Sequence, residues 1–335
     1  MNVGKVQESV LKRSVLKYVQ QNNKSFDNLC HLINGAKVGA DCALFAISEA
    51  GPDRMGSATA VAIGRHRMVV VEAMMNACNN LICGGAEAFG VELALILPEA
   101  VFESELRHMM EEAVKFAADH QITILGGHTT VSPFVTETIA TATVIGKGCG
   151  FEVRDLKPGM DVVMSKWIGL QGTAKIAASK REVLEKRLPF RMISEAAGYD
   201  RYMSIIPEAR VAMNAGVCAM HDISGGGIFR ALWELAELAE TGIRIDLKKI
   251  PVKQETIEIC EVFGLNPYEL LSGGALLMVT EDGEGLVEKL AAAGIAAAEI
   301  GRLTDDNDRV IVTHSEDGDE IRFLDRPKTD EIDKL

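Results

Sequence analysis

Hydrophobic and polar residues follow two different periods along the chain, and their order predicts a mixed α/β protein. Between residues 103 and 120 the apolar positions recur three and four residues apart, which predicts an amphipathic helix. Residues 91–97 and 275–280 are short apolar runs of the length expected for buried strands. Because both halves of the chain mix strands and helices in this way, we expect two α/β (α+β mixed) layers in one protein.

The same patterns predict the other elements of the first half. Residues 1–20 have the spacing of a surface amphipathic helix. Residues 58–63 and 68–71 are strand-like, and we expect them to pair as a hairpin across the four residues between them. A helix is predicted to begin at Met74 and to end at Gly84, because glycine favours helix termination.

The length of the chain predicts more than one domain. At 335 residues it exceeds one ordinary hydrophobic core. A turn-forming stretch near residues 150–158 is the expected boundary, which gives an N-terminal domain over residues 1–150 and a C-terminal domain over residues 151–335. The acidic residues after Asp317 predict a solvated surface.

The stretch CAMHDISGGGIFRALWEL, residues 218–235, carries the most informative chemistry. A short apolar run delivers His221 and Asp222 to a turn with three glycines, and helical spacing follows. The amides that open such a helix attract an anion, and glycine lets the backbone approach it closely. We therefore expect a phosphate near Ser224, Gly225, Gly226 and Gly227. The alternative is a turn that only connects two elements, with Asp222 or Ser224 as a helix N-cap.

A second glycine pair follows the strand predicted at 122–125. It is followed by a histidine and two hydroxyl side chains, which together with backbone amides can approach phosphate oxygens. The residues are Gly126, Gly127, His128, Thr129 and Thr130. A histidine in such a place is also commonly structural.

Three further polar residues stand at apolar elements. Asp41 lies at the mouth of an apolar strand, where it can hold a divalent cation or serve as a turn residue. Asn79 and Asn80 lie within the apolar helix predicted from Met74, where buried amides need partners. These asparagines either satisfy neighbouring backbone groups, or one of them faces a ligand.

Charge and composition exclude several classes of protein. The net charge of −13, without any basic run, argues against a nucleic-acid partner. No apolar run is long enough to span a bilayer, and residues 1–20 lack a targeting signal. The seven cysteines contain no CxxC pair, so we expect reduced thiols, no metal cluster and a cytoplasmic location. Neither a P-loop nor a complete dinucleotide-binding glycine pattern is present.

Taken together, these segments resemble the aminoimidazole ribonucleotide synthetase (PurM-like) superfamily. Within it they are most similar to the AIR synthase-related, HypE-type hydrogenase maturation factors. The matching segments, in order, are GADCAL, NACNNLICGGAEA, LGGHTT, LKPGMDVVMSKWIGLQGT, MHDISGGGIFRALWELAE and NPYELLSGGALLMV. They extend over about residues 37–313, nearly the whole chain.

The resemblance implies a two-domain PurM-like fold and a homodimer. The N-terminal domains of the two copies would pair their sheets into a shared β-barrel, and each C-terminal domain would be an α/β sandwich. It also implies ATP and Mg²⁺ as cofactors. Asp41 would be a metal or phosphate ligand, Asn79 and Asn80 would line the nucleotide groove, and residues 126–130 would contact the phosphates. His221, Asp222 and residues 224–227 would complete the site.

The chain departs from the family pattern in ways that predict weaker metal binding or a different way of holding the metal. Asn80 and Cys42 stand where the family commonly has aspartates, and the strand predicted at 58–63 carries no acidic residue. Hard cations prefer charged oxygen ligands. HypE-type factors also end in a cysteine that accepts a carbamoyl group, whereas this chain ends DEIDKL, so we expect it not to make a cyanide group in that way.

Three hypotheses for the function follow. The first is an ATP-dependent enzyme that activates an amide-like substrate or phosphorylates a small molecule. The second is a nucleotide-binding protein with little catalytic activity that serves a maturation partner or a regulatory role. The third is an unrelated role for the same fold with another small molecule.

Overall fold

The computed structural model describes residues 8–17, 19, 31–34, 37–38, 40–46, 54–148, 156–315, 318–325 and 329–335. The chain forms two compact units, which are described separately. The N-terminal unit comprises residues 26–36 and 40–150. The C-terminal unit comprises residues 151–335 together with residues 1–25 and 37–39. The start of the helix predicted over 1–20, and most of the boundary predicted near 150–158, lie outside the described residues.

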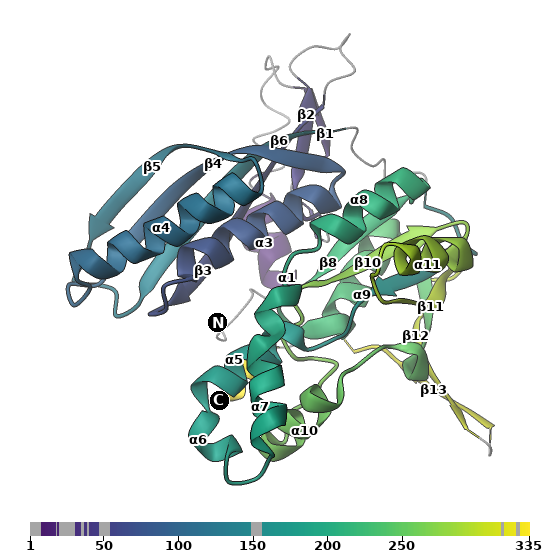
Figure 1. The fold of residues 1–335 in the computed structure, drawn as a ribbon. Helices are drawn as coiled ribbons and strands as arrows, with labels where there is room; N and C mark the ends of the chain where they lie inside the picture. Colours follow the sequence, from purple (N-terminus) through teal and green to yellow (C-terminus); the bar gives the residue numbers. More distant parts are fainter. Residues whose placement is uncertain are drawn as a thin grey trace. The chain divides into compact units, whose positions relative to one another are not determined.

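In the described residues of the N-terminal unit, a six-stranded sheet carries helices α3 and α4 on one face (Figure 1). The strand order is β1-β2-β3-β6-β4-β5; only β4 and β5 run parallel, and the other neighbours are antiparallel. The elements are β1 (His31–Asn34), β2 (Ala43–Ala46), β3 (Arg54–Gly64), α3 (Val69–Cys83), β4 (Ala86–Leu97), α4 (Glu103–Asp119), β5 (Thr123–Val131) and β6 (Thr138–Gly148). The strands described do not close into a barrel within one chain.

Period-two alternation explains why this sheet has one buried face. In β6, Ala140, Ala142 and Val144 are fully buried, whereas the residues between them are partly exposed. On the opposite face of β3, Val61 and Ile63 are 53% and 58% exposed. The helices therefore cover one face, and the other carries apolar side chains that stay exposed.

The hairpin predicted between residues 58–63 and 68–71 is wrong. The second run is the start of α3, and β3 pairs instead with β2 and β6. Val69 and Val70 are fully buried. A four-residue apolar run fits a buried helix as well as a strand, and here tertiary burial decides between them. The helix predicted at 103–120 is confirmed as α4.

The C-terminal unit contains a seven-stranded sheet of order β13-β12-β9-β11-β7-β10-β8, in which only β12 and β9 are parallel. Helices α8 and α11 cover one face and α9 packs on the other (Figure 1). The elements are β7 (Asp161–Ser165), α8 (Ile206–Ala215), β8 (Ala219–Ile223), α9 (Gly227–Ala239), β9 (Gly242–Asp246), β10 (Ala275–Thr280), α11 (Gly283–Ala292), β11 (Ala297–Thr304), β12 (Arg309–Ser315) and β13 (Gly318–Phe323). The buried strands predicted in this half, such as residues 275–280, are confirmed.

A group of helices next to this sheet has a small core of its own. The core includes Ile176, Leu184, Ile193 and Ile259, each at most 1% exposed. The helices are α5 (Leu170–Ser179), α6 (Arg181–Leu184), α7 (Phe190–Ala197) and α10 (Gln254–Phe263). Short helical turns η3 (Gly198–Tyr202) and η4 (Leu247–Lys249) connect them to the sheet.

The acidic end of the chain is only partly solvated. Strand β13 is exposed throughout, as the charge pattern predicts. However, Asp330 and Glu331, at the turn η5 (Glu331–Lys334), are 8% and 4% exposed. Their burial corrects the expectation of a solvated surface, because backbone amides of the C-terminal unit bind both carboxylates.

Candidate functional site

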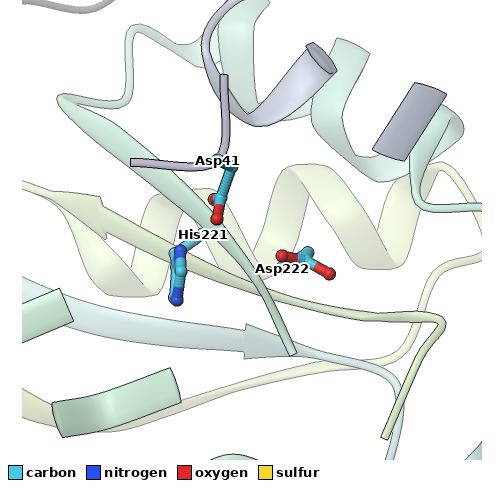
Figure 2. Close-up of side chains that lie close together, drawn as sticks. All are labelled: Asp41, His221 and Asp222. Carbon is cyan, nitrogen blue, oxygen red and sulfur yellow. The ribbon is translucent and has the colours of Figure 1, made fainter. Parts of the chain in front are cut away.

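In the C-terminal unit, β8 delivers two adjacent polar side chains to opposite faces of the sheet (Figure 2). His221 shares its face with Ala219 and Ile223, which pack against α9, and it is 2% exposed. Asp222 leaves the other face and is half-buried. His221 and Asp222, which the resemblance expects to complete the site, therefore differ in burial, although their ligand atoms lie within 4.8 Å of each other, and Asp222 is the more accessible of the two.

His221 faces two charged residues of α9 that the sequence pattern alone did not single out. Glu234 Oε2 lies 3.4 Å from His221 Nε2, and Arg230 Nη1 lies 4.0 Å from Glu234 Oε1. The Arg230 and Glu234 side chains are only 6% and 13% exposed. Charged residues on the buried face of an otherwise apolar helix need partners. The positions of Arg230 and Glu234 within the apolar pattern of this helix are therefore a signal that the sequence contains.

The predicted strand, turn and helix over residues 218–235 are confirmed as β8, a glycine turn and α9. Gly226 and Gly227 have φ of +88° and +64°, in the left-handed region that glycine adopts readily. A Cβ on Gly227 would also lie 2.4 Å from the carbonyl oxygen of Tyr268. Glycine is therefore required here by both conformation and close packing.

The glycine turn already binds an anionic group of the chain itself. The Gly226 amide donates to Oδ2 of Asp330 at 2.5 Å, from a position 104 residues away in the sequence. The amides of Leu271 and Ile332 donate to Oδ1 of the same side chain at 3.1 Å and 2.9 Å. The anion-binding character expected of this turn is thus used by a carboxylate.

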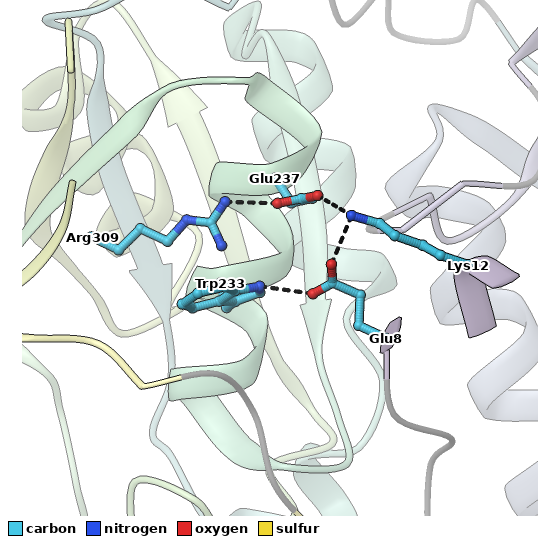
Figure 3. Close-up of polar contacts among 5 residues, drawn as sticks. All are labelled: Glu8, Lys12, Trp233, Glu237 and Arg309. Atoms are coloured by element: carbon cyan, nitrogen blue, oxygen red, sulfur yellow. Dashed lines mark hydrogen bonds and ion pairs between the residues drawn. The ribbon is translucent and has the colours of Figure 1, made fainter. Parts of the chain in front are cut away.

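The first described segment of the chain also contacts α9 (Figure 3). It consists of α1 (Glu8–Leu11) and the π-helical turn η1 (Lys12–Leu16). Trp233 Nε1 donates to Glu8 at 3.0 Å, and Lys12 forms ion pairs with Glu8 and Glu237. Arg309 completes the network. Its Nη2 lies 2.8 Å from Glu237 Oε2, and its guanidinium carbon lies 3.9 Å from the centre of the Trp233 ring. These contacts hold the segment to the exposed side of α9.

A buried ion pair lies at the end of β7. Lys166 Nζ is 2.7 Å from Glu208 Oε1 and donates to the carbonyl oxygens of Tyr202 and Ser204 at 2.8 Å and 2.7 Å. Burial lowers the pKa of the Lys166 ammonium, although the nearby Glu208 raises it. Because every donor has an acceptor, we interpret this pair as a structural feature that joins β7 to α8.

In the N-terminal unit, the glycine pair predicted to end a strand lies within β5 itself. By its register with β4, His128 is opposite Ala94 and Thr129 is opposite Leu95. His128 therefore lies on the open face of the sheet, and Thr129 on the face that carries the helices. Both are exposed. The prediction that the strand ends here is wrong, because an irregularity in the register lets it continue through the glycines.

Gly127 is the residue that makes this continuation possible. Its φ is +151°, and a Cβ there would lie 1.8 Å from the carbonyl oxygen of Leu93 on β4. Gly126, by contrast, has open space where a Cβ would be. Two neighbouring glycines thus have different roles: close strand pairing requires Gly127, and Gly126 leaves the backbone accessible on an edge strand.

The remaining predicted residues also belong to the N-terminal unit. Asp41 precedes β2 and is half-buried (Figure 2). Asn79 and Asn80 lie near the end of α3; Asn79 is 4% exposed and Asn80 is partly exposed. Cys42 packs against Gly84, and burial raises the pKa of its thiol to about 12. Cys42 is therefore a neutral thiol and not a replacement for the second aspartate of the family.

Two further observations concern the cysteines and the helices of the described residues. The cysteines in the described part of the chain are free thiols, namely Cys42, Cys78, Cys83, Cys218 and Cys260. None of the helices described is both long and apolar enough to cross a membrane.

Comparison with known protein families assigns the chain. The profile of the AIR synthase related protein, N-terminal domain, matches residues 39–147, and that of the AIR synthase related protein, C-terminal domain, matches residues 157–313. The chain belongs to the AIR synthase related family. The expected resemblance is thereby confirmed, and the two profiles match consecutive parts of the chain.

The chain is also similar to individual relatives. A putative hydrogenase expression/formation protein of Methanocaldococcus jannaschii is 28% identical over 247 residues, which cover 72% of this chain and 71% of the relative. A carbamoyl dehydratase HypE of Rhodobacter capsulatus is 26% identical over 230 residues, which cover 67% of this chain and 64% of the relative.

Solved structures of HypE proteins have the same fold. A chain of the HypE–HypF complex superposes with a TM-score of 0.71 at 21% identity, over 94% of this chain and all of that chain. A hydrogenase maturation protein HypE in complex with ATP superposes with a TM-score of 0.66 at 17% identity, over 99% and 98% of the two chains. The mixed α/β, PurM-like fold is therefore confirmed.

Proposed function

We propose that this member of the AIR synthase related family is an ATP-dependent enzyme that activates an amide-like oxygen or phosphorylates a small molecule. The observation that carries the proposal is the match of both family domains in order, with the His221-Asp222 pair and its glycine turn in the second. The carbamoyl dehydratase relative and the ATP complex of a HypE support it.

On the N-terminal side, the edge strand β5 supports nucleotide binding. Gly126, Thr129 and Thr130 are exposed, and open space lies where a side chain at Gly126 would be. Backbone amides and hydroxyl groups on an open strand edge are suitable donors for phosphate oxygens. We propose that residues 126–130 contact the phosphates of ATP and that Asn79 and Asn80 line the nucleotide site.

The carboxylates available fit Mg²⁺, which prefers oxygen ligands. Asp41 and Asp222 are half-buried aspartates, so each can present oxygens while remaining accessible. Cys42 does not fit, because its thiol stays protonated. We propose that Asp41 is a ligand of the metal, which would neutralise phosphate charge during transfer, and that Asp222 acts on the C-terminal side of the reaction.

We assign the histidines different tasks. His128 is exposed on the open face of β5, where it can contact a substrate or donate a proton. His221 is buried beside Glu234, so we propose that it supports Asp222 from the opposite face of β8. Phosphoryl transfer depends mainly on positioning and on charge neutralisation, which such groups supply.

We further propose that the protein is a homodimer joined through the sheet of the N-terminal unit. The open face of this sheet carries Val61, Ile63 and Phe89, each at least 45% exposed. Exposed apolar sheet faces are typical of association surfaces. A second copy would cover this face with the same surface, which is the usual arrangement of a two-fold dimer and allows a shared barrel.

The second candidate is a nucleotide-binding protein that serves a maturation partner and turns over ATP slowly. Asn80 and Cys42, which stand where the family commonly has carboxylates, favour it. A solved complex of HypE with a partner protein, HypF, is compatible with such a role. Both candidates require nucleotide binding and differ in the rate of ADP release.

The test is ADP release and ATP binding by the purified protein, with and without Mg²⁺. We expect Asp41→Ala and Asp222→Ala to lower ATP affinity or turnover far more than they lower the melting temperature. Asp119→Ala and Asp305→Ala remove exposed acids from the same two units and should behave like wild type. Absence of nucleotide binding at millimolar ATP and Mg²⁺ would rule out both candidates.

A further inference from the structure

The Asp330 carboxylate occupies the glycine turn that follows Asp222. It accepts hydrogen bonds from the amides of Gly226, Leu271 and Ile332, and it is 8% exposed. The Ile332 amide belongs to the same turn as Asp330, whereas the Gly226 and Leu271 amides come from other loops, and backbone amides of this kind also bind phosphate groups. Asp330 lies beyond residues 157–313, the part of the chain that matches the C-terminal family domain.

Asp330 joins two loops that lead into neighbouring strands. The turn containing Gly226 follows β8, and the loop containing Leu271 precedes β10, which pairs with β8. The two loops also touch directly, since the Ser272 amide donates to the carbonyl oxygen of Ser224 at 3.3 Å. The Asp330 side chain therefore links these two loops.

The segment that carries Asp330 is docked by several weaker contacts. Glu331 Oε2 accepts from the Asn266 amide at 3.1 Å, and the Glu331 amide donates to the carbonyl oxygen of Glu269 at 3.3 Å. Lys180 Nζ donates to the carbonyl oxygen of Leu335 at 2.9 Å. Ile332 of the same segment also packs against the hydrophobic core of the neighbouring helices. Residues 329–335 form no β-sheet pairing, so their release breaks these side-chain and turn contacts without disrupting a sheet.

Burial destabilises the ionised form of the Asp330 carboxylate. Burial raises the pKa of Asp330 and the nearby Asp333 adds to this, although the amides of Gly226, Ile332 and Leu271 lower it. The hydrogen bonds therefore do not fully replace the water that the ionised side chain loses. A dianionic or trianionic phosphate group has more charge and more acceptor oxygens, and it would bind the Gly226 amide more strongly.

We propose that Asp330 makes an autoinhibitory contact: it occupies the Gly226 amide in the resting protein, and a phosphate group of the nucleotide or substrate reaches that amide only after residues 329–335 are released. This inference rests on the proposed function, because it concerns regulation of the same site. Two anions cannot share one amide, so binding of the ligand and docking of the segment exclude each other. Docking then lowers the apparent affinity for this ligand, because only molecules in which the segment is released can bind it.

Asp330→Asn tests this contact with little change in volume. The Asn carboxamide can still accept from Leu271 and Ile332 through its oxygen, but its NH₂ group faces the Gly226 amide and cannot accept from it. Asp333→Asn is the matched control, because it removes the same charge from an exposed position three residues away. We expect Asp330→Asn to bind ATP with Mg²⁺ about fivefold or more tightly than wild type, by titration calorimetry, and Asp333→Asn to bind like wild type.

Hydrogen exchange in the wild-type protein provides a second measurement that needs no variant. Saturating ATP should speed exchange at the Ile332 and Leu271 amides, which lose Asp330, while the Gly226 amide stays protected by the ligand. The inference is overturned if Ile332 remains as protected with ATP as without it, or if Asp330→Asn binds ATP no more tightly than wild type. Failure of the proposed function looks different, because then neither wild type nor Asp330→Asn binds ATP, which also removes the basis of this inference.

Discussion

Glu234 Oε2 lies 3.4 Å from Nε2 of His221, where α9 crosses the sheet of the C-terminal unit. The carboxylate lies beside an imidazole that is 2% exposed, and it also lies near Arg230. A carboxylate behind a histidine commonly sets the tautomer and orientation of its ring. Glu234 and His221 therefore link helix α9 to strand β8, which also carries Asp222.

Replacement of Glu234 tests this relationship. We expect Glu234→Gln to lower the turnover of ATP about tenfold or more, because the neutral amide no longer stabilises one orientation of His221. The KM for ATP should stay near wild type, and the pH profile of turnover should shift. Glu237→Gln on the same helix is the control, since Glu237 contacts Lys12 and Arg309 but not His221. Equal losses in both variants would assign Glu234 a structural role only.

The neighbouring glycines of β5 give a matched pair of substitutions. Gly127→Ala places a Cβ 1.8 Å from the Leu93 carbonyl oxygen, so we expect a loss of about 2–4 kcal/mol in the free energy of unfolding. Gly126→Ala meets open space and should change it by less than about 0.5 kcal/mol. Urea denaturation of both variants measures the difference. If Gly126→Ala also leaves ATP affinity intact, the phosphate contact proposed at this residue is wrong.

The dimer is tested by charge on the open face of the N-terminal sheet. Val61→Glu combined with Ile63→Glu should convert a dimer to a monomer, because two carboxylates would be buried without partners at the interface. The mass in solution, by light scattering, is the readout. Val114→Glu is the control, because Val114 is 55% exposed on α4, on the other side of the sheet. A wild-type protein that is monomeric at all concentrations would contradict the proposal.

The buried ion pair at the end of β7 predicts a non-additive effect on stability. Lys166→Met leaves the Glu208 carboxylate, 2% exposed, without its cation, and we expect a loss of about 3–5 kcal/mol. Changing Glu208 to Leu in the same protein should restore much of this loss, because the uncompensated charge disappears. Denaturant unfolding of the two single variants and the double variant measures the coupling. Additive losses would show that the two side chains act independently.

The pKa of the Cys42 thiol predicts its reactivity. Burial raises this pKa to about 12, so the thiol stays protonated at any pH at which the protein is ordinarily handled. Since the thiolate is the reactive form, alkylation of the Cys42 peptide should remain slow from neutral pH to about pH 9 and become fast only after unfolding. Mass spectrometry of iodoacetamide-treated protein provides the measurement. Cys78, whose pKa burial also raises to about 12, should behave in the same way.

The sequence by itself determined the features that depend on neighbours along the chain. The helical period of residues 103–120 became α4, and the apolar run ahead of three glycines became β8, a turn and α9. These elements follow from local rules, since side-chain period and glycine conformation act over a few residues. The order of the glycine and acidic motifs also identified the family, because such motifs consist of residue types and spacings alone.

Tertiary structure decided where distant residues meet. No local pattern states that Asp330 binds the amide of Gly226, that Glu234 lies beside His221, or that β5 continues through its glycine pair. Each of these depends on strand register and on packing between segments far apart in the chain. Such contacts are selected by the burial of the whole core and not by local spacing, so the sequence left open the partners of its own candidate residues.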